Sequence, residues 1–145
     1  MDGIEKIIGS SFLGFDKTGK TQVFKYTDNE PAEYWLLYFS AKWCKYCKKV
    51  APKLVDFYQN APGAIEVLFV SADQNQEEYD AYTKGMPWLR IDYKDQARIK
   101  RLASIFHVDG IPEIVVLNRQ GRPVHLKAVD KLLKDSKGID FPWTT

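Results

Sequence analysis

Cysteine is scarce in this chain of 145 residues, which contains only Cys44 and Cys47. A small protein that relies on disulfides in place of a core has several cysteine pairs. Histidine is equally scarce, since His107 and His125 are the only two. A closed structural zinc site takes four ligands, and these histidines lack the short spacing of a zinc finger. The sequence therefore argues against a disulfide scaffold and against a metal site.

The chain also lacks long apolar runs and blocks of one charge. No stretch approaches the ~20 apolar residues of a membrane-spanning helix, and residues 1–6 do not resemble the start of a signal peptide. The 21 basic and 19 acidic residues are spread along the sequence, whereas a nucleic-acid-binding protein gathers its basic residues on one face. We therefore expect a cytoplasmic protein that binds neither membranes nor nucleic acids.

The apolar residues that are present are enough for one folded domain. Hydrophobic residues make up 45% of the sequence, which is sufficient for a core in a chain of this length. We expect a single domain over residues 1–145, present as a monomer.

Strand-like and helix-like segments alternate, which predicts an α/β fold with helices on both faces of a central sheet. The three central strand segments are continuous apolar runs, which is typical of strands buried on both sides. The predicted strands are 21–26, 34–40, 65–71, 113–117 and 123–127, and the predicted helices are 44–60, 76–84 and 97–106. Pro52 predicts a kink in the first helix, and residues 118–121 predict a hairpin turn.

The spacing of the two cysteines predicts a redox-active dithiol. Cys44 follows a predicted strand and opens a predicted helix, where free N–H groups and the helix dipole stabilise an anion. Because the thiolate is the form that attacks a disulfide, Cys44 is the predicted nucleophile. Cys47 lies nearly one helical turn further on and is placed to resolve the mixed disulfide. An inert structural cysteine pair is the alternative.

Lysines surround this pair in the sequence, at Lys42, Lys45, Lys48 and Lys49. Their positive field favours a thiolate and attracts anionic partners. The alternative is a solvated, lysine-rich start of a helix, because exposed lysines are common.

Apolar and proline-containing segments supply candidate binding residues. We expect Trp43 to be exposed as part of a rim for a protein partner, and Trp88 to be buried in the core. Pro112 precedes a predicted strand, in the segment Gly110-Ile111-Pro112. Because proline cannot donate a ladder hydrogen bond, this position leaves neighbouring backbone groups free.

Taken in order, these segments resemble the thioredoxin superfamily, and within it the tryparedoxin and nucleoredoxin branch. The matching segments span most of the chain: 38–41, 43–47, 52–58, 71–73, Met86-Pro87-Trp88-Leu89, 110–112 and Phe141-Pro142-Trp143. The resemblance implies a thioredoxin fold with a central mixed sheet. It also implies a cis peptide bond before Pro112, pairing of the Ile111 backbone with the substrate, an exposed Cys44 and a shielded Cys47.

Three positions depart from the family pattern. Lys45 and Tyr46 replace the Pro-Pro that usually separates the cysteines, and they are expected to tune the redox potential. Tyr38 stands where thioredoxins have a buried aspartate, as it also does in tryparedoxins, so proton transfer at Cys47 is assigned to Asp73, Lys45 or water. Glu113 follows Pro112 where threonine is usual.

The predicted function is that of a thiol-disulfide oxidoreductase without a metal or organic cofactor. The resemblance implies that protein disulfides, such as those of peroxiredoxin-type or glutathione-peroxidase-type enzymes, are substrates. It also implies a low-molecular-weight dithiol or a reductase as electron donor. One alternative is a non-enzymatic, redox-sensitive interaction module that binds partners through Trp43 and Ile111. Another is a glutaredoxin-like, glutathione-dependent reductase, which only Tyr46 favours.

Overall fold

The computed structural model describes residues 3–28, 32–61 and 63–144, so the ends of the predicted domain, 1–2 and 145, lie outside the described residues. Seven strands form one sheet: β1 (Ser11–Phe15), β2 (Thr21–Lys25), β3 (Tyr34–Ser40), β4 (Ile65–Ser71), β5 (Leu89–Arg90), β6 (Glu113–Asn118) and β7 (Pro123–His125). The helices are α1 (Gly3–Ile8), α2 (Cys47–Asn60), α3 (Gln76–Thr83), α4 (Gln96–Ile105) and α5 (Val129–Lys134), with a short 3-10 turn at Tyr26–Asp28.

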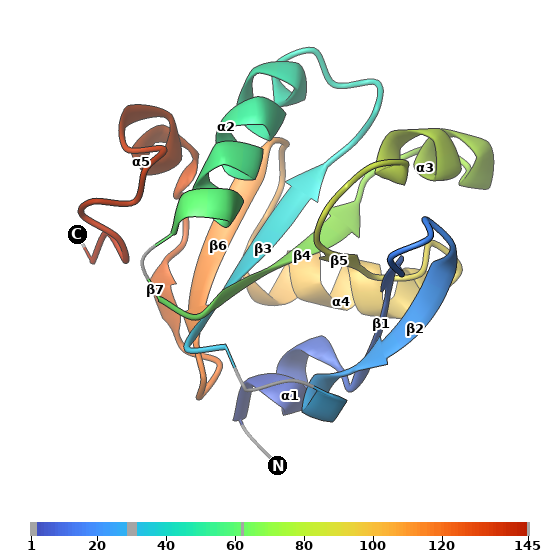
Figure 1. Ribbon diagram of the computed structural model, residues 1–145, viewed down its shortest axis with the longest axis horizontal. Helices are drawn as coiled ribbons and strands as arrows, with labels where there is room; N and C mark the ends of the chain where they lie inside the picture. Colours follow the sequence, from blue (N-terminus) through green and yellow to red (C-terminus); the bar gives the residue numbers. More distant parts are fainter. Residues whose placement is uncertain (1–2, 29–31, 62, 145) are drawn as a thin grey trace.

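The sheet is mixed, with the strand order β2-β1-β5-β4-β3-β6-β7 (Figure 1). Strands β3, β4 and β5 are parallel to one another, whereas β6 and β1 pair with this group in the antiparallel sense. The central strands β3, β4 and β6 are the continuous apolar runs of the sequence, and they are buried on both sides. The predicted mixed sheet is therefore confirmed.

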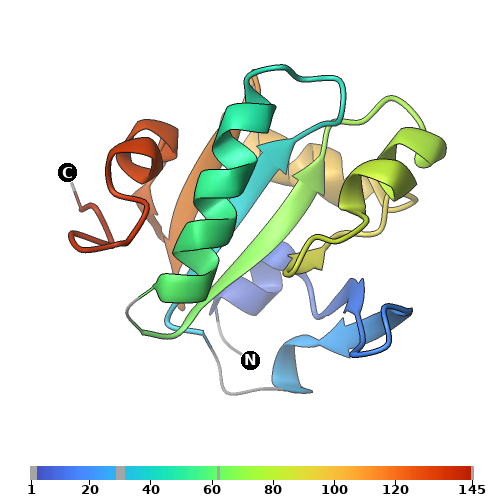
Figure 2. The same cartoon turned by 45° about the horizontal axis from the view of Figure 1, so that its top comes forward.

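Two hydrophobic clusters cover the two faces of the sheet. Leu37 and Phe39 of β3 face a cluster that includes residues of α1 and α4, while Leu36 and Tyr38 face a cluster that includes residues of α2, α3 and α5. This alternation follows from the two-residue period of a strand. Figure 2 shows α2 crossing one face of the sheet while α4 lies behind it. The prediction of helices on both faces is confirmed.

Several predicted boundaries are wrong by one or two residues, and four short elements are absent from the prediction. β2 ends at Lys25, β6 extends to Asn118 and β7 ends at His125. The elements that the sequence pattern missed are α1, β1, β5 and α5, each of two to six residues. Segments this short carry only a few residues of a helical or strand pattern, so tertiary contacts decide their conformation.

The predicted hairpin turn at residues 118–121 is present, and the long helix α2 is unbroken. The Gly121 N–H donates to the Asn118 carbonyl at 2.9 Å, and Gly121 has a φ of 84°, which closes the turn between β6 and β7. Helix α2 continues through Pro52 to Asn60. No helix in the described part of the chain is long and apolar enough to cross a membrane.

The carboxyl-terminal segment packs against α2 within the hydrophobic cluster on this face of the sheet. Trp143 and Phe141 stack around Phe57, with ring centroids 5.2 and 5.1 Å from it. The Trp143 Nε1 donates to Asp135 Oδ2 at 2.9 Å, and this bond together with backbone N–H donors holds the pKa of Asp135 below its usual range. The helix that follows the cysteines is therefore held by both the sheet and this segment.

Replacing this aromatic anchor tests its contribution to stability. We expect Trp143→Ala to lower the free energy of unfolding by about 3 kcal/mol, because a buried tryptophan and its hydrogen bond are both lost. Chemical denaturation of the oxidised protein measures this change. The exposed Ile139 lies nearby, and Ile139→Ala should change the free energy by less than about 0.5 kcal/mol. Equal effects for the two variants would contradict the packing argument.

Candidate active site

The two cysteines lie where β3 passes into α2. β3 ends at Ser40, and the following loop forms a turn in which the Cys44 N–H donates to the Ala41 carbonyl at 3.2 Å. The predicted helix start at Cys44 is wrong, because α2 begins at Cys47. The N–H groups of Lys48 and Lys49 bond to carbonyls only three residues back, so the chain enters the helix through a tight turn.

The sulfur of Cys44 accepts a hydrogen bond at the start of α2. The Cys47 N–H donates to Cys44 Sγ at 3.2 Å. Tyr46, the residue that caps the helix, makes no side-chain capping bond of its own. The sulfur therefore occupies the place of a capping acceptor, at the positive end of the helix dipole. This arrangement stabilises negative charge on Cys44.

Cys44 and Cys47 are joined by a disulfide, with their Cα atoms 5.3 Å apart. Cys44 is only 6% exposed and Cys47 is fully buried. The expectation that Cys44 is exposed is therefore wrong, because the tight turn holds its sulfur close to the rest of the protein. Trp43 and Tyr46 beside it are 52% and 48% exposed. The exposed Trp43 and the buried Trp88 both match the sequence prediction.

Two hydrogen bonds attach the cysteine loop to the end of β4. The Trp43 Nε1 donates to the Ala72 carbonyl at 3.0 Å, and the Lys42 N–H donates to Asp73 Oδ1 at 2.7 Å. Asp73 Oδ2 also accepts the Ser71 hydroxyl at 2.6 Å. Burial raises the pKa of Asp73. The only signal of this clamp in the sequence is an acidic residue shortly after a buried strand.

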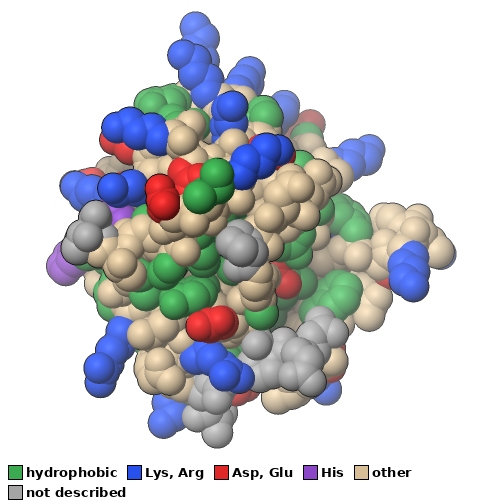
Figure 3. All heavy atoms as spheres, turned by 60° about the vertical axis from the view of Figure 1, so that its left-hand side comes forward, with side chains coloured by type: hydrophobic (Ala, Val, Ile, Leu, Met, Phe, Trp, Pro, Cys, Tyr) green, Lys and Arg blue, Asp and Glu red, His purple; other side chains and the backbone are tan. Residues whose placement is uncertain are grey.

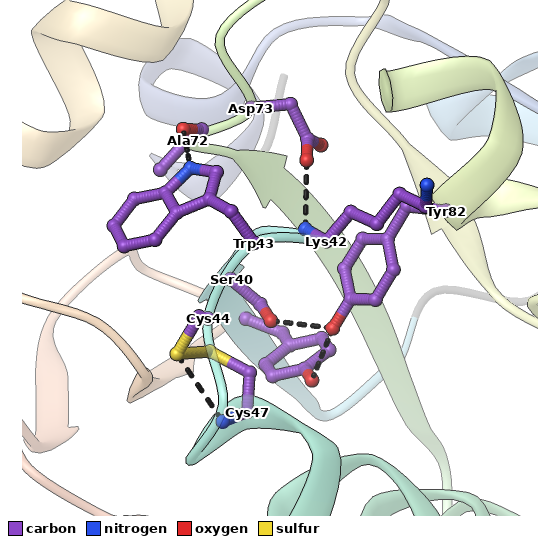
Figure 4. Close-up of a disulfide and its surroundings, with 9 residues drawn as sticks. Ser40, Lys42, Trp43, Cys44, Cys47, Ala72, Asp73 and Tyr82 are labelled. Carbon is purple, nitrogen blue, oxygen red and sulfur yellow. Dashed lines mark hydrogen bonds between the residues drawn. A yellow bond between two sulfur atoms is a disulfide. The ribbon is translucent and has the colours of Figure 1, made fainter. Parts of the chain in front are cut away.

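Asp73 was also a predicted proton acceptor for Cys47. Figure 4 shows its carboxylate turned toward the Lys42 backbone and away from the two sulfurs. Asp73 therefore anchors the cysteine loop. Lys45, the second predicted acceptor, is exposed to solvent between the cysteines together with Tyr46.

A cluster of hydroxyl groups lies beneath the loop. The Ser40 and Tyr82 hydroxyls are 2.7 Å apart, and the Tyr38 hydroxyl is 3.4 Å from that of Tyr82 (Figure 4). Tyr38 and Ser40 are fully buried, and burial raises the pKa of Tyr38 far above neutrality, so it stays uncharged. Where thioredoxins have a buried acid, this protein has neutral hydroxyls. Tyr82 is a member that the sequence analysis missed.

The loop that precedes β6 forms the next part of the site. The peptide bond between Ile111 and Pro112 is cis, the form that the resemblance implied. Glu113, the first residue of β6, pairs with Phe39 of β3, so this loop lies beside the end of β3 and the cysteine turn. Ile111 and Trp43 line one groove of about 400 Å³. The structure thus brings together the two residues predicted to bind a partner.

The far wall of the groove comes from α4, which the sequence analysis did not assign to the site. Its lining side chains there are Gln96, Ile99, Lys100 and Ala103. The two histidines lie elsewhere, since His107 follows α4 and His125 is in β7. In the part of the chain that the structure describes, no group of three potential ligands is placed to hold a metal ion.

Comparison with known proteins agrees with this fold and site. A family model described as thioredoxin-like matches residues 32–123. Tryparedoxin from Trypanosoma brucei brucei is 33% identical over 110 residues, which cover 74% of this chain and 76% of that protein. A solved structure of tryparedoxin from Trypanosoma brucei superposes with a TM-score of 0.88 and 27% identity, covering 100% of both chains.

Two further proteins are also similar to this chain. Nucleoredoxin from Mus musculus is 37% identical over 110 residues, 74% of this chain, but the match spans only 25% of that longer protein. The structure of tryparedoxin II complexed with glutathionylspermidine superposes with a TM-score of 0.87 and 26% identity, covering 99% of each chain. The chain therefore belongs to the thioredoxin-like family, in the branch of the tryparedoxins and nucleoredoxins, and has the fold and cysteine pair of a dithiol oxidoreductase.

Proposed function

We propose that this protein reduces disulfide bonds in other proteins, with Cys44 as the nucleophile and Cys47 as the resolving residue. The hydrogen bond from the Cys47 N–H to Cys44 Sγ is the observation that carries the proposal. It assigns the anion-stabilising position to Cys44. The complete burial of Cys47 supports the same division of roles, because of the two cysteines only Cys44 keeps any exposed surface.

The reaction proceeds by two thiol-disulfide exchanges. The Cys44 thiolate attacks one sulfur of the substrate disulfide, forms a mixed disulfide and releases the other substrate sulfur as a thiolate. The Cys47 thiol loses its proton to solvent, attacks Cys44 Sγ and releases the second substrate sulfur. Two electrons pass from the protein to the substrate, whose thiolates take up protons from water. The protein ends as the Cys44–Cys47 disulfide.

The groove between Trp43 and Ile111 is the proposed substrate site. It supplies an aromatic ring on one side and the backbone before Pro112 on the other. Because a proline at the edge leaves backbone groups unpaired, an extended substrate segment can pair with Ile111 as a short strand does. Ile99 and Ala103 of α4 then pack against the substrate side chains.

The proposed substrates are thiol peroxidases of the peroxiredoxin or glutathione-peroxidase type. The proposed electron donor is a low-molecular-weight dithiol or a reductase. The donor proposal draws support from the glutathionylspermidine bound to the related tryparedoxin II. Lys45 and Tyr46 set the redox potential in place of the usual prolines. We propose that this chemistry takes place in the cytoplasm and requires no metal or organic cofactor.

A non-enzymatic interaction module is the second candidate. Trp43 and Tyr46 favour it, because two half-exposed aromatic residues flank the disulfide and form a surface that binds protein partners. In that case the redox state of the cysteines would change partner affinity without turnover. A glutaredoxin-like reaction with glutathione is a third candidate, supported only by Tyr46.

Glu113 introduces a charge next to the proposed substrate segment. It is partly buried beside Pro112, and its Oε1 accepts the Ile114 N–H at 3.1 Å. Burial raises the pKa of Glu113, and the positive charge of Lys127 opposes this shift. The folded protein therefore holds the ionised carboxylate less favourably than the unfolded chain does.

Trapping experiments test the roles of the cysteines. We expect Cys47→Ser to accumulate mixed disulfides through Cys44, because the resolving thiol is missing. Cys44→Ser should form none above background. Non-reducing electrophoresis and mass spectrometry of the adducts measure both variants on the same disulfide substrate. The reverse pattern would overturn the assignment, and trapping by neither variant would favour the interaction module.

The charge of Glu113 is tested by the pH dependence of stability. Glu113→Gln should raise the free energy of unfolding at pH 7, because the variant removes an ionised group that burial disfavours. This gain should vanish near pH 3, where the carboxyl is protonated in both the folded and unfolded states. Glu33→Gln, which removes the same charge from an exposed position, is the control and should show no such gain. A difference that does not vary with pH would refute the account of Glu113.

A further inference from the structure

A row of lysines leads from the disulfide along α2. Lys45, Lys48, Lys49 and Lys53, here called the lysine stripe, are all exposed. Lys49 and Lys53 are four residues apart and therefore lie along one side of α2, while Lys45 lies in the turn just before the helix. In Figure 3, basic side chains project from the upper end of the molecule, the end at which α2 begins in Figure 1.

No stripe lysine forms a salt bridge in the described residues, and the acidic side chain that interacts with the stripe, Asp56 near Lys53, is already bonded to Lys137. Within residues 3–28, 32–61 and 63–144, the salt bridges join Arg98 to Asp95 and Lys137 to Asp56, and neither includes a stripe lysine. The first turn of α2 contains no acidic residue. The positive charge is therefore available to a partner in solution.

These lysines occupy positions that helix physics disfavours. Positive side chains near the amino end of a helix oppose its dipole, where acidic residues would stabilise it. Lysines four residues apart on the same face repel each other. Residues that break local preferences without a structural gain mark functional surfaces in folded proteins.

Stabilisation of the Cys44 thiolate explains only part of the stripe. Lys45 and Lys48 adjoin the cysteines in sequence and act on the sulfur directly. Lys53 lies about 9 Å beyond Cys47 along the helix axis, at 1.5 Å per residue. This separation is comparable to the screening length of about 8 Å at physiological salt. The charge of Lys53 is therefore largely screened from Cys44 and is available for another purpose.

The excess of positive charge lies on one side of the cysteines only. In the groove on the other side, Lys100 is accompanied by Asp109, while the Asp73 carboxylate is engaged by Lys42 and Ser71. The Lys42 side chain itself runs away from the sulfur pair (Figure 4). A substrate held across the disulfide thus meets charges of both signs at the groove and a cationic surface along α2.

We propose that the lysine stripe docks an acidic polypeptide segment adjacent to the substrate disulfide. The inference rests on the proposed exchange chemistry at Cys44 and adds the substrate class, namely proteins with aspartate or glutamate flanking the reactive cysteine. Complementary charge raises the rate of encounter and orients the segment across Cys44. Substrates with basic residues flanking the disulfide are repelled from the same surface.

Matched peptide disulfides test this preference. Two peptides differ only in having glutamate or lysine beside the disulfide, and the uncharged 2-hydroxyethyl disulfide serves as reference. The reduction rate of each peptide is measured with dithiothreitol as the reductant that regenerates the protein. Each rate is then divided by the rate on the reference disulfide, so that changes in Cys44 reactivity cancel. We expect the acidic peptide to react roughly tenfold faster at low ionic strength, and the ratio to approach one in about 1 M salt.

Charge-reversal variants test whether the preference for the acidic peptide depends on the lysine stripe. Lys49→Glu with Lys53→Glu should abolish or invert the preference, and the neutral pair Lys49→Gln with Lys53→Gln should reduce it severalfold. Lys6→Glu with Lys25→Glu makes the same change of net charge at exposed positions on α1 and at the end of β2. This control lies at the opposite end of the sheet (Figure 1) and should keep the preference.

The outcomes separate the two proposals. Reduction of 2-hydroxyethyl disulfide with equal normalised rates for the two peptides would overturn the docking surface and leave the proposed function standing. A preference that survives both stripe variants would also overturn it. A reduced protein that reacts with none of the three disulfides would overturn the proposed function itself.

Discussion

The bond between the Cys47 N–H and the sulfur of Cys44 is the interaction on which the rest of the site depends. It joins the cysteine turn to the first residue of α2 at a distance of 3.2 Å. A sulfur is a weak acceptor as a thiol and a stronger one as a thiolate, because hydrogen bonds to charged groups are stronger. The same N–H that begins the helix therefore favours ionisation of the reduced Cys44.

The surrounding fold holds this turn in place from three directions. Asp73 and Ala72 bind the loop to the end of β4, and the cis peptide bond at Pro112 closes the site from β6. Phe57 on α2 is fixed by the aromatic carboxyl-terminal segment. Because these anchors belong to packed strands and helices, the sulfur is presented by a rigid scaffold, as preorganised catalysis requires.

Much of this arrangement follows from the sequence. The apolar runs of β3 and β4 predict their strands residue for residue, and the spacing of Cys44 and Cys47 predicts their pairing. The helix start at Cys47 did not follow, because helical spacing does not distinguish a tight turn from the first turn of a helix. The clamp at Asp73 and the hydroxyl of Tyr82 depend on contacts between distant segments, which periodicity does not encode. The near-burial of Cys44 follows from the same tight turn that delays the helix start.

The pH dependence of Cys44 alkylation tests the central claim most directly. In the reduced Cys47→Ser variant, which leaves a single thiol, the rate of reaction with iodoacetamide follows the thiolate fraction of Cys44. The account predicts a fast reaction with an apparent pKa well below the value of about 8.5 for a free thiol. A slow reaction that titrates near 8.5 would show that the start of α2 does not hold this sulfur as an anion, and would contradict the account.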